Sequence, residues 1–181
     1  MVARAERAVL LDGVGSDALA TAVAEAAVEL GRVPVVVPAR GFWRPAGERF
    51  QHGREDWQAF RDTWLDAQAL RREVLDSGAS YLPALWDVDR DRSARQAVVP
   101  LPAKGLLVVP GLFLSGLGLP GLMVHLALSP GALSRRGVPT WQLPAFTTYD
   151  DEVRPGDLCD VLVRAEDPRR PAVLFRAQSL R

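Results

Sequence analysis

Short apolar runs recur along the chain. The first run ends at the turn pair Asp12-Gly13, and the second is rich in β-branched valines. Short apolar runs of this kind are typical of strands that are buried on both faces of a parallel sheet. The pattern therefore predicts five buried strands, over residues 8–11, 33–37, 106–109, 122–128 and 158–163.

Between the first two runs, apolar residues recur at helical spacing. Ser16 or Asp17 is suited to cap the start of a helix, and Gly31 stands where the glycine that follows a helix belongs. The segment from Ser16 to Leu30 is therefore predicted to be a helix. A strand, a helix and a strand within about 30 residues form a parallel βαβ unit.

The remaining segments fit the same fold class. Residues 56–75 carry Trp57, Phe60 and Trp64 at mixed helical spacing and predict a second helix, whereas residues 138–157 are short of helix signals. We expect one α/β domain over residues 1–181, with three layers around a doubly wound parallel sheet of about five strands. Ligands of such sheets bind at the carboxyl ends of the strands, so the residues after each strand are the candidate site.

Composition narrows the class of function. The 181 residues carry 22 Lys+Arg and 22 Asp+Glu, and this balance argues against a general binder of nucleic acids or membrane surfaces. Cys159 is the single cysteine, so a disulfide within the chain is excluded, a cysteine-based metal site is disfavoured, and a cytoplasmic location is expected. Pro110 and Pro120 interrupt the apolar stretch 105–128, which indicates two strands and a loop rather than a membrane span.

The turn after the first strand is the first candidate for chemistry; its residues are Asp12, Gly13, Gly15, Ser16 and Asp17. A glycine-rich turn before a helix brings free backbone N–H groups and the positive end of the helix dipole to one place, which suits an anion. A working phosphate loop also needs a lysine and a Ser/Thr hydroxyl at fixed spacing, and Ala18, Leu19 and Ala20 stand there instead. An ordinary strand-to-helix turn is the competing interpretation.

Further motifs follow along the chain. Arg40-Gly41-Phe42-Trp43-Arg44-Pro45 comes after the second strand, the segments 81–87 and 107–114 follow, and Tyr149, Glu152, Pro155 and Asp160 complete the series. In content and order these motifs resemble the uridine kinase-like family of P-loop nucleoside kinases, of actinobacterial type. The resemblance covers nearly the whole chain. It implies the P-loop NTPase fold, a nucleoside as acceptor and, for an active member, ATP with magnesium.

The resemblance also indicates where catalytic residues are missing. It places Leu19 at the phosphate lysine, Ala20 at the magnesium hydroxyl, Arg40 or Gly41 at the carboxylate base, and Pro110 at a later acidic position. Phosphoryl transfer depends on such groups for positioning and charge stabilisation, so no catalytic residue is assigned.

The lid region, residues 130–148, is shorter than the family's lid. It keeps Arg135 and Arg136, while much of the closing helix is expected to be missing. Aromatic and arginine side chains lie where the family binds its nucleoside, and such groups suit a planar base and a ribose. A solvated helical face explains the same pattern equally well. The candidate nucleoside pocket comprises Phe42, Trp43, Arg44, Arg49, Arg54, Tyr81 and Asp87.

Other polar residues have simple structural explanations. Asp87, Asp89 and Asp91 predict an exposed turn with local arginine pairing. His125 lies inside an apolar run and predicts a hydrogen-bonded core histidine. Cys159 predicts a buried, inert thiol. No metal site follows from any of them.

Three hypotheses for function remain. The leading one is a catalytically degenerate, kinase-like protein that binds a nucleoside, a nucleotide or a protein partner. The second is a working nucleoside kinase that uses ATP and magnesium with displaced residues on phosphate, such as Arg40 or Lys104, the only lysine in the chain. The third is a structural subunit that associates with itself or a partner through the apolar loop Phe113 to Leu122.

Overall fold

One six-stranded sheet forms the centre of the molecule; its strands are β1 (Ala8–Asp12), β2 (Val33–Val36), β7 (Gly105–Gly111), β8 (Leu122–Ala127), β9 (Val161–Arg164) and β10 (Ala172–Phe175). The structure, a computed structural model, describes residues 7–167 and 170–176. The strand order is β10-β9-β8-β1-β7-β2. Neighbouring strands from β9 to β2 run parallel, and β10 runs antiparallel to β9.

The sheet confirms the predicted parallel α/β class and the five predicted strands. Burial of the second strand was predicted wrongly, because β2 lies at the edge of the sheet, where Val33 and Val36 are 42% and 46% exposed. The helix α1 (Ser16–Glu29) connects β1 to β2, and Gly31 follows it with a positive φ of 69°, as predicted. The last predicted strand begins at Val161 rather than at Leu158, because Leu158 ends the short helix α7 (Pro155–Leu158). The sequence analysis did not predict β10, a short strand at the edge of the sheet.

The prediction of one helix over residues 56–75 is wrong. The segment forms α3 (Trp57–Asp62), α4 (Ala67–Leu70) and the π-helical turn η3 (Arg71–Leu75). The helix is interrupted because the backbone between α3 and α4 bonds elsewhere: Arg44 N donates to Trp64 O at 2.8 Å, and Asp66 N donates to Phe42 O at 2.9 Å. Asp66 then caps α4, since its carboxylate accepts from Ala69 N at 3.0 Å.

Residues 138–157 are also more helical than the sequence predicted. The region from residue 130 onward contains α5 (Pro130–Arg135), the 3-10 turn η4 (Thr140–Gln142), α6 (Leu143–Glu152) and α7. Pro144 and Pro155 occupy the first turns of α6 and α7. A proline is tolerated there because its missing N–H would have no partner within the helix. Pro144 and Pro155, which the sequence pattern assigned to loops, therefore lie at the starts of helices.

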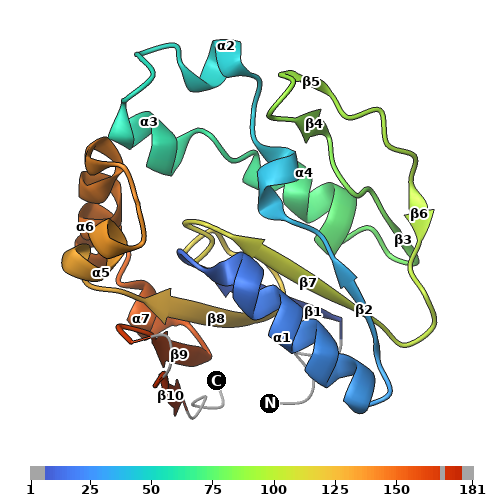
Figure 1. Cartoon of the computed structure of the whole chain (residues 1–181). Helices are drawn as coiled ribbons and strands as arrows, with labels where there is room; N and C mark the ends of the chain where they lie inside the picture. Colours follow the sequence, from blue (N-terminus) through green and yellow to red (C-terminus); the bar gives the residue numbers. More distant parts are fainter. Residues whose placement is uncertain (1–6, 168–169, 177–181) are drawn as a thin grey trace.

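The segment between β2 and β7 extends beyond the sheet. It contains the 3-10 turn η2 (Ala39–Phe42), α2 (Ala46–Arg49) and two small strand pairs, β3 (Ser80–Tyr81) with β6 (Val99–Pro100) and β4 (Trp86–Asp87) with β5 (Arg92–Ser93). Figure 1 shows α2 and the β4–β5 hairpin at the top of the molecule, away from α1.

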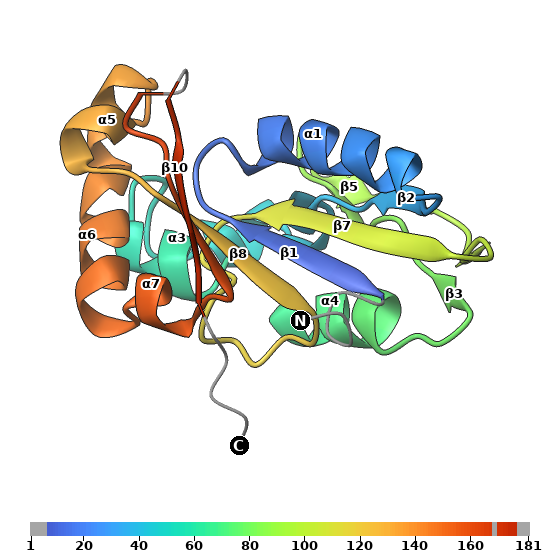
Figure 2. The same cartoon turned by 90° about the horizontal axis from the view of Figure 1, so that it is seen from below.

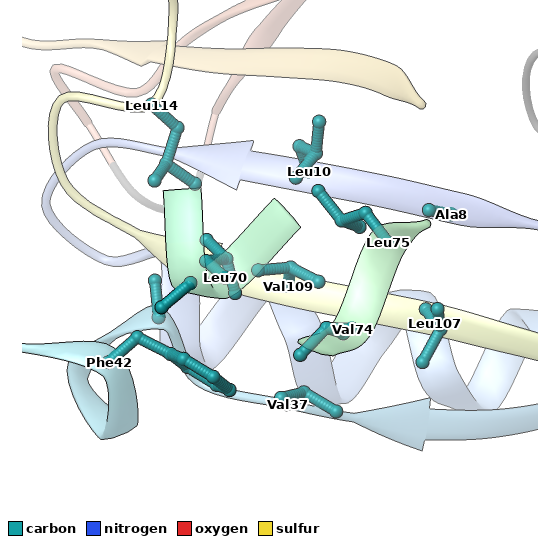
Figure 3. Close-up of a cluster of buried hydrophobic side chains, with 12 residues drawn as sticks. Ala8, Leu10, Val37, Phe42, Leu70, Val74, Leu75, Leu107, Val109 and Leu114 are labelled. Atoms are coloured by element: carbon teal, nitrogen blue, oxygen red, sulfur yellow. The ribbon is translucent and has the colours of Figure 1, made fainter. Parts of the chain in front are cut away.

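Helices cover both faces of the sheet. Figure 2 shows α1 on one side of β1 and β7, and α4 on the other. Alternate residues of β1 serve the two faces: Leu11 packs in a cluster with Ala20 and Ala27 of α1, whereas Leu10 packs in a second cluster with Leu70 of α4 (Figure 3). The three expected layers are therefore present. Among the described residues, none of the helices is long and apolar enough to cross a membrane.

Candidate functional site

The turn at the carboxyl end of β1 is much shorter than a phosphate loop. β1 ends at Asp12 and α1 begins at Ser16, so Gly13, Val14 and Gly15 form the whole connection. The signature of a phosphate loop has four residues between its two glycines. Here Ala18 replaces the second glycine, and of the four residues after Gly13, the last two, Ser16 and Asp17, already belong to α1. A strand, a glycine turn and a helix start are thus present, but the loop that wraps a phosphate is not.

The short turn is bonded and packed from several sides. Gly13 N donates to Gly111 O at 2.9 Å, and Ser16 N donates to Gly13 O at 3.2 Å. A Cβ on Gly13 would lie 2.8 Å from Leu126 O, and a Cβ on Gly15 would lie 3.0 Å from an Arg136 guanidinium nitrogen. The backbone N–H groups of Gly13 and Ser16 are therefore already engaged, and little open space surrounds the turn.

The start of α1 differs from both sequence predictions. Gly15, with a φ of 96°, is the N-cap, so the prediction of Ser16 or Asp17 as cap is wrong. The Ser16 hydroxyl instead donates to Gly111 O at 3.3 Å. Asp17 is exposed in the first turn of the helix, where a carboxylate interacts favourably with the helix dipole. The same negative charge opposes the binding of a phosphate.

The positions expected for the phosphate lysine and the magnesium hydroxyl lie one turn into α1. Ala20 is 2% exposed, and Leu19 packs against the same core cluster between α1 and the sheet. Lys104, the residue proposed to replace the missing lysine, directly precedes β7. Because β7 extends about 3.3 Å per residue, Lys104 is on the order of 20 Å from Gly111 at the carboxyl end. The structure therefore contradicts a role for Lys104 on a phosphate at this turn.

The positions expected for acidic residues after β2 and within β7 are closed. A Cβ on Gly41 would lie 2.8 Å from the Cβ of Ala84, so no side chain fits there. Pro110 is fully buried. Arg40 forms two hydrogen bonds with the carboxylate of Asp89, one of them 3.0 Å long. None of these positions presents a base to a substrate.

The predicted nucleoside pocket is not assembled as one cavity. Phe42 is 1% exposed and lies in the core, and Tyr81 packs against the same cluster. Arg54 stacks on Phe50, with 5.1 Å between the guanidinium carbon and the ring centre. Arg44 pairs with acidic neighbours, Glu48 at 3.4 Å and Asp66 at 3.9 Å.

Asp87 is the member of this set that lines a cavity, one of about 540 Å³ beside Trp86 and Arg92. Its partner is Arg90, at 3.1 Å. The Asp87–Arg90 pair confirms local arginine pairing at this position. Asp89 and Asp91 are exposed as predicted, but their arginine partners, Arg40 and Arg49, come from a distant segment.

Trp43 and Arg49 belong to an aromatic cluster around Phe60. The ring of Phe60 contacts Trp43, Trp64 and Trp141 edge-on, with centroid distances of 6.4, 4.9 and 5.5 Å. Arg49 is 4% exposed, and its guanidinium carbon lies 5.1 Å from the Trp64 ring centre. Burial lowers the pKa of Arg49. These contacts indicate that the aromatic rings and the Arg49 guanidinium stabilise the α2–α3 region rather than bind the base of a nucleoside.

The carboxylate of Asp12 is the centre of a buried polar cluster. Asp12 is fully buried and accepts hydrogen bonds from Leu114 N at 3.0 Å, the Ser115 hydroxyl at 2.8 Å and the Tyr149 hydroxyl at 2.7 Å. The Nδ1 atom of His125 lies 3.1 Å from the same carboxylate. The prediction of a hydrogen-bonded core histidine is therefore confirmed. Asp12, His125 and Tyr149 are each recognisable in the sequence, but no local pattern indicates that they meet.

Charge and burial set the protonation of this cluster. Burial alone raises the pKa of Asp12, but the hydrogen bond and charge of His125, with the Leu114 amide and the Tyr149 hydroxyl, bring it below its ordinary value. Burial and the charge of Asp12 raise the pKa of Tyr149, so its hydroxyl remains a donor. The adjoining cavity is only about 20 Å³, room for about one water. The cluster can hold an ionised carboxylate, but the cavity cannot hold a nucleoside.

Solved structures share this arrangement of strands and helices. A possible uridine kinase from Bacillus stearothermophilus matches 87% of this chain and 88% of its own, with a TM-score of 0.69 and 18% identity. Phosphoribulokinase from Rhodobacter spheroides matches 89% of this chain and 70% of its own, with a TM-score of 0.59 and 10% identity. The chain has the P-loop kinase fold. No protein-family model matches the chain, and no curated protein matches it in sequence.

The region predicted as the lid, residues 130–148, contacts the loop after β9 through hydrogen bonds and an ion pair. Arg136 donates to Ala165 O at 2.6 Å, and Arg135 lies 3.8 Å from the carboxylate of Glu166. Glu166 in turn accepts from the Ser129 hydroxyl at 2.8 Å. The two predicted lid arginines are thus held by protein partners, and Arg136 also lies against the glycine turn.

The remaining predictions concern the apolar loop, the cysteine and metals. Phe113 and Leu114 are buried, which leaves the outer part of the Phe113–Leu122 loop, where Leu117 is 43% exposed, for any association. Cys159 is buried and its pKa is raised by burial, as predicted for an inert thiol. Among residues 7–167 and 170–176, no group of three His, Cys, Asp or Glu side chains is placed to hold a metal.

Proposed function

We propose that this chain is a P-loop kinase-fold protein that does not transfer phosphoryl groups and acts by binding a small phosphate-bearing or nucleoside-type molecule. The length of the connection between β1 and α1 carries the proposal. Gly13, Val14 and Gly15 span this connection. A connection of this length lacks the series of backbone N–H groups with which a longer loop surrounds a triphosphate.

The charges around the turn between β1 and α1 support the proposal that this protein does not transfer phosphoryl groups. Asp17 adds a negative charge at the start of α1. Lys104 lies before the amino end of β7, at the opposite end of the strand from the turn, and Arg40 is paired with Asp89. Loss of one group that stabilises the transition state commonly costs about 10²–10³-fold in rate. Such losses do not add simply, but a site without lysine, metal hydroxyl and base retains little activity.

The solved structures with a similar fold support the proposed class of ligand, a phosphate-bearing or nucleoside-type molecule. They are described as a possible uridine kinase and a phosphoribulokinase, proteins named for a nucleoside and for a phosphorylated sugar. Folds host many functions, so we carry over the ligand class and not the reaction.

A phosphoryl-transfer assay tests the proposal. Purified protein is incubated with ATP, magnesium and uridine, and ADP formation is measured; we expect no ADP above that of a protein-free blank. The Asp89→Asn variant, which frees Arg40 from its partner, tests the displaced-residue alternative and is also expected to be inactive. Uridine-dependent ADP formation at about 1 s⁻¹, the low end of ordinary enzymes, would contradict the proposal.

Melting curves extend the same test to binding. A ligand that binds only the folded state raises the Tm. We expect any rise in Tm with ATP to be the same with and without magnesium, because the turn offers no cradle for a magnesium-bound triphosphate.

A further inference from the structure

Three arginines line a cavity that shares His125 and Asp150 with the small cavity beside Asp12. The cavity has a volume of about 320 Å³ and lies between α7 and the strands β8 and β9. Its charged and polar lining consists of His125, Asp150, Arg154, Asp157, Arg164 and Arg176. We call it the arginine cavity. It is distinct from the glycine turn, none of whose residues lines it.

Strand register places these side chains on one face of the sheet. His125 of β8 pairs with Leu162 of β9, which in turn pairs with Leu174 of β10. Side chains two residues apart on a strand share a face. Arg164 therefore lies on the same face as Leu162 and His125, and Arg176, two residues beyond Leu174, continues that face. Residues distant in sequence are brought together by the sheet itself.

The cavity has an excess of positive charge. Arg176 pairs with Asp157 at 3.2 Å. Arg154 and Arg164 have no acidic partner among residues 7–167 and 170–176. Against its three arginines the lining holds two carboxylates, Asp157 and Asp150, and burial raises the pKa of Asp150. Two guanidinium groups are thus available to a ligand without breaking an ion pair.

His125 supplies a fixed polar group at the wall of the cavity. Its side chain is 6% exposed, and Asp12 engages Nδ1 at 3.1 Å. Within the described part of the chain, no hydrogen bond to its other ring nitrogen, Nε2, is present. A carboxylate that engages one ring nitrogen orients the imidazole, so the opposite nitrogen is held in a defined direction.

We propose that the arginine cavity binds a compact phosphate-bearing anion through Arg154 and Arg164, with the oriented ring of His125 as a further contact. The inference rests on the binding role proposed above and places that role away from the glycine turn. Guanidinium groups match phosphate oxygens with paired, charge-assisted hydrogen bonds. The volume admits a diphosphate or a small sugar phosphate, and small-ligand sites are typically about 300 Å³ or more.

Isothermal titration calorimetry with pyrophosphate, at constant ionic strength and without magnesium, tests the site. We expect saturable binding that the Arg164→Gln and Arg154→Gln variants each weaken by about tenfold or more, since each loses a charge-assisted hydrogen bond. Arg92→Gln, which changes an exposed arginine of the β4–β5 hairpin, is the matched control and should bind as the unaltered protein does. The Tm of each variant without ligand verifies that it is folded.

Two results would overturn the inference. One is the absence of saturable binding to the unaltered protein. The other is full binding by Arg154→Gln and Arg164→Gln together with a loss in Arg136→Gln, which would move the anion to the glycine turn beside Gly15. The phosphoryl-transfer assay gives an independent result, because it measures ADP formation from ATP and magnesium, whereas the calorimetry measures the binding of pyrophosphate without magnesium. Failure of this site and failure of the proposed function are therefore distinguishable.

Discussion

Asp12 joins distant parts of the chain at a single carboxylate. Its partners come from the loop after β7, through Leu114 and Ser115, from β8, through His125, and from α6, through Tyr149. A buried ionised group is stable only when its hydrogen-bonding capacity is filled, and this one is filled by three donors besides the imidazole. The residue that resembles the start of a phosphate loop thus acts here as a structural centre.

We predict that Asp12→Asn lowers the free energy of unfolding by about 3 kcal/mol at pH 7, because an amide cannot accept from the same donors. The folded-state pKa of Asp12 is lowered, so its contribution is complete above the unfolded value of about 4 and is lost as pH falls through the folded value. The difference between the two proteins should therefore shrink from pH 5 toward pH 2. Urea denaturation across this range measures it.

Asp89→Asn is the control for that comparison. It removes an exposed carboxylate that pairs with Arg40, and exposed pairs contribute about 0–1 kcal/mol. A constant difference between Asp12→Asn and the unaltered protein down to pH 2 would contradict the assignment of an ionised, stabilising Asp12.

At the scale of elements, the connection between β1 and α1 determines what the fold can hold. Gly13 and Gly15 both have positive φ, and both lie against neighbouring groups. The turn is therefore fixed by backbone conformation and by close packing at the same time. A connection without these contacts would have room for a ligand.

Replacing glycines by alanine separates the effect of backbone conformation on stability from the effect of close packing. Gly13→Ala should cost more than 2 kcal/mol of stability, because the backbone is left-handed and the new Cβ would lie 2.8 Å from Leu126 O. Gly53→Ala has a similar positive φ, 121° against 123° at Gly13, with nothing within 4 Å, and should cost only about 1 kcal/mol. Urea midpoints measure both. Equal losses would mean that packing at the turn contributes nothing.

At the scale of the whole molecule, the P-loop kinase fold is kept while the region around the turn after β1 is filled by packing. The turn after β1 is short, Ala84 fills the space at Gly41, and Arg136 lies against Gly15. These contacts come from three separate segments. The close packing around the turn is therefore a property of the assembled molecule, and under the proposed function we expect that restoring single charges does not restore phosphoryl transfer.

The double variant Ser16→Lys/Asp17→Thr tests this conclusion. It places a lysine and a hydroxyl at the start of α1 without lengthening the turn. We expect no uridine-dependent ADP formation, because a backbone cradle for the phosphates is still missing. The assay with ATP, magnesium and uridine is the measurement, with the unaltered protein as control. ADP formation by the variant would show that the missing charges, and not the turn, prevent transfer.

The sequence was sufficient for the five parallel strands of the sheet and insufficient for the short outer strands and for the site. Five parallel strands could be predicted because buried β-branched runs are a local pattern. The break between α3 and α4 could not, because it depends on backbone hydrogen bonds of residues 64 and 66 to the distant Arg44 and Phe42. The partners of Asp12, the packing of Gly41 on Ala84 and the lining of one cavity by His125 and Arg164 likewise depend on segments far apart in the chain.

The aromatic cluster around Phe60 gives the protein an internal optical reporter. Of five tryptophans in the chain, Trp43, Trp57, Trp64 and Trp141 pack in or against this cluster, and Trp86 lies on the β4–β5 hairpin. Tryptophan emission will therefore follow mainly the separation of α3 from its neighbour α6. Far-ultraviolet circular dichroism instead follows all helices, α1 included. Coincident denaturation curves from the two signals would mean that this contact and the sheet unfold as one unit.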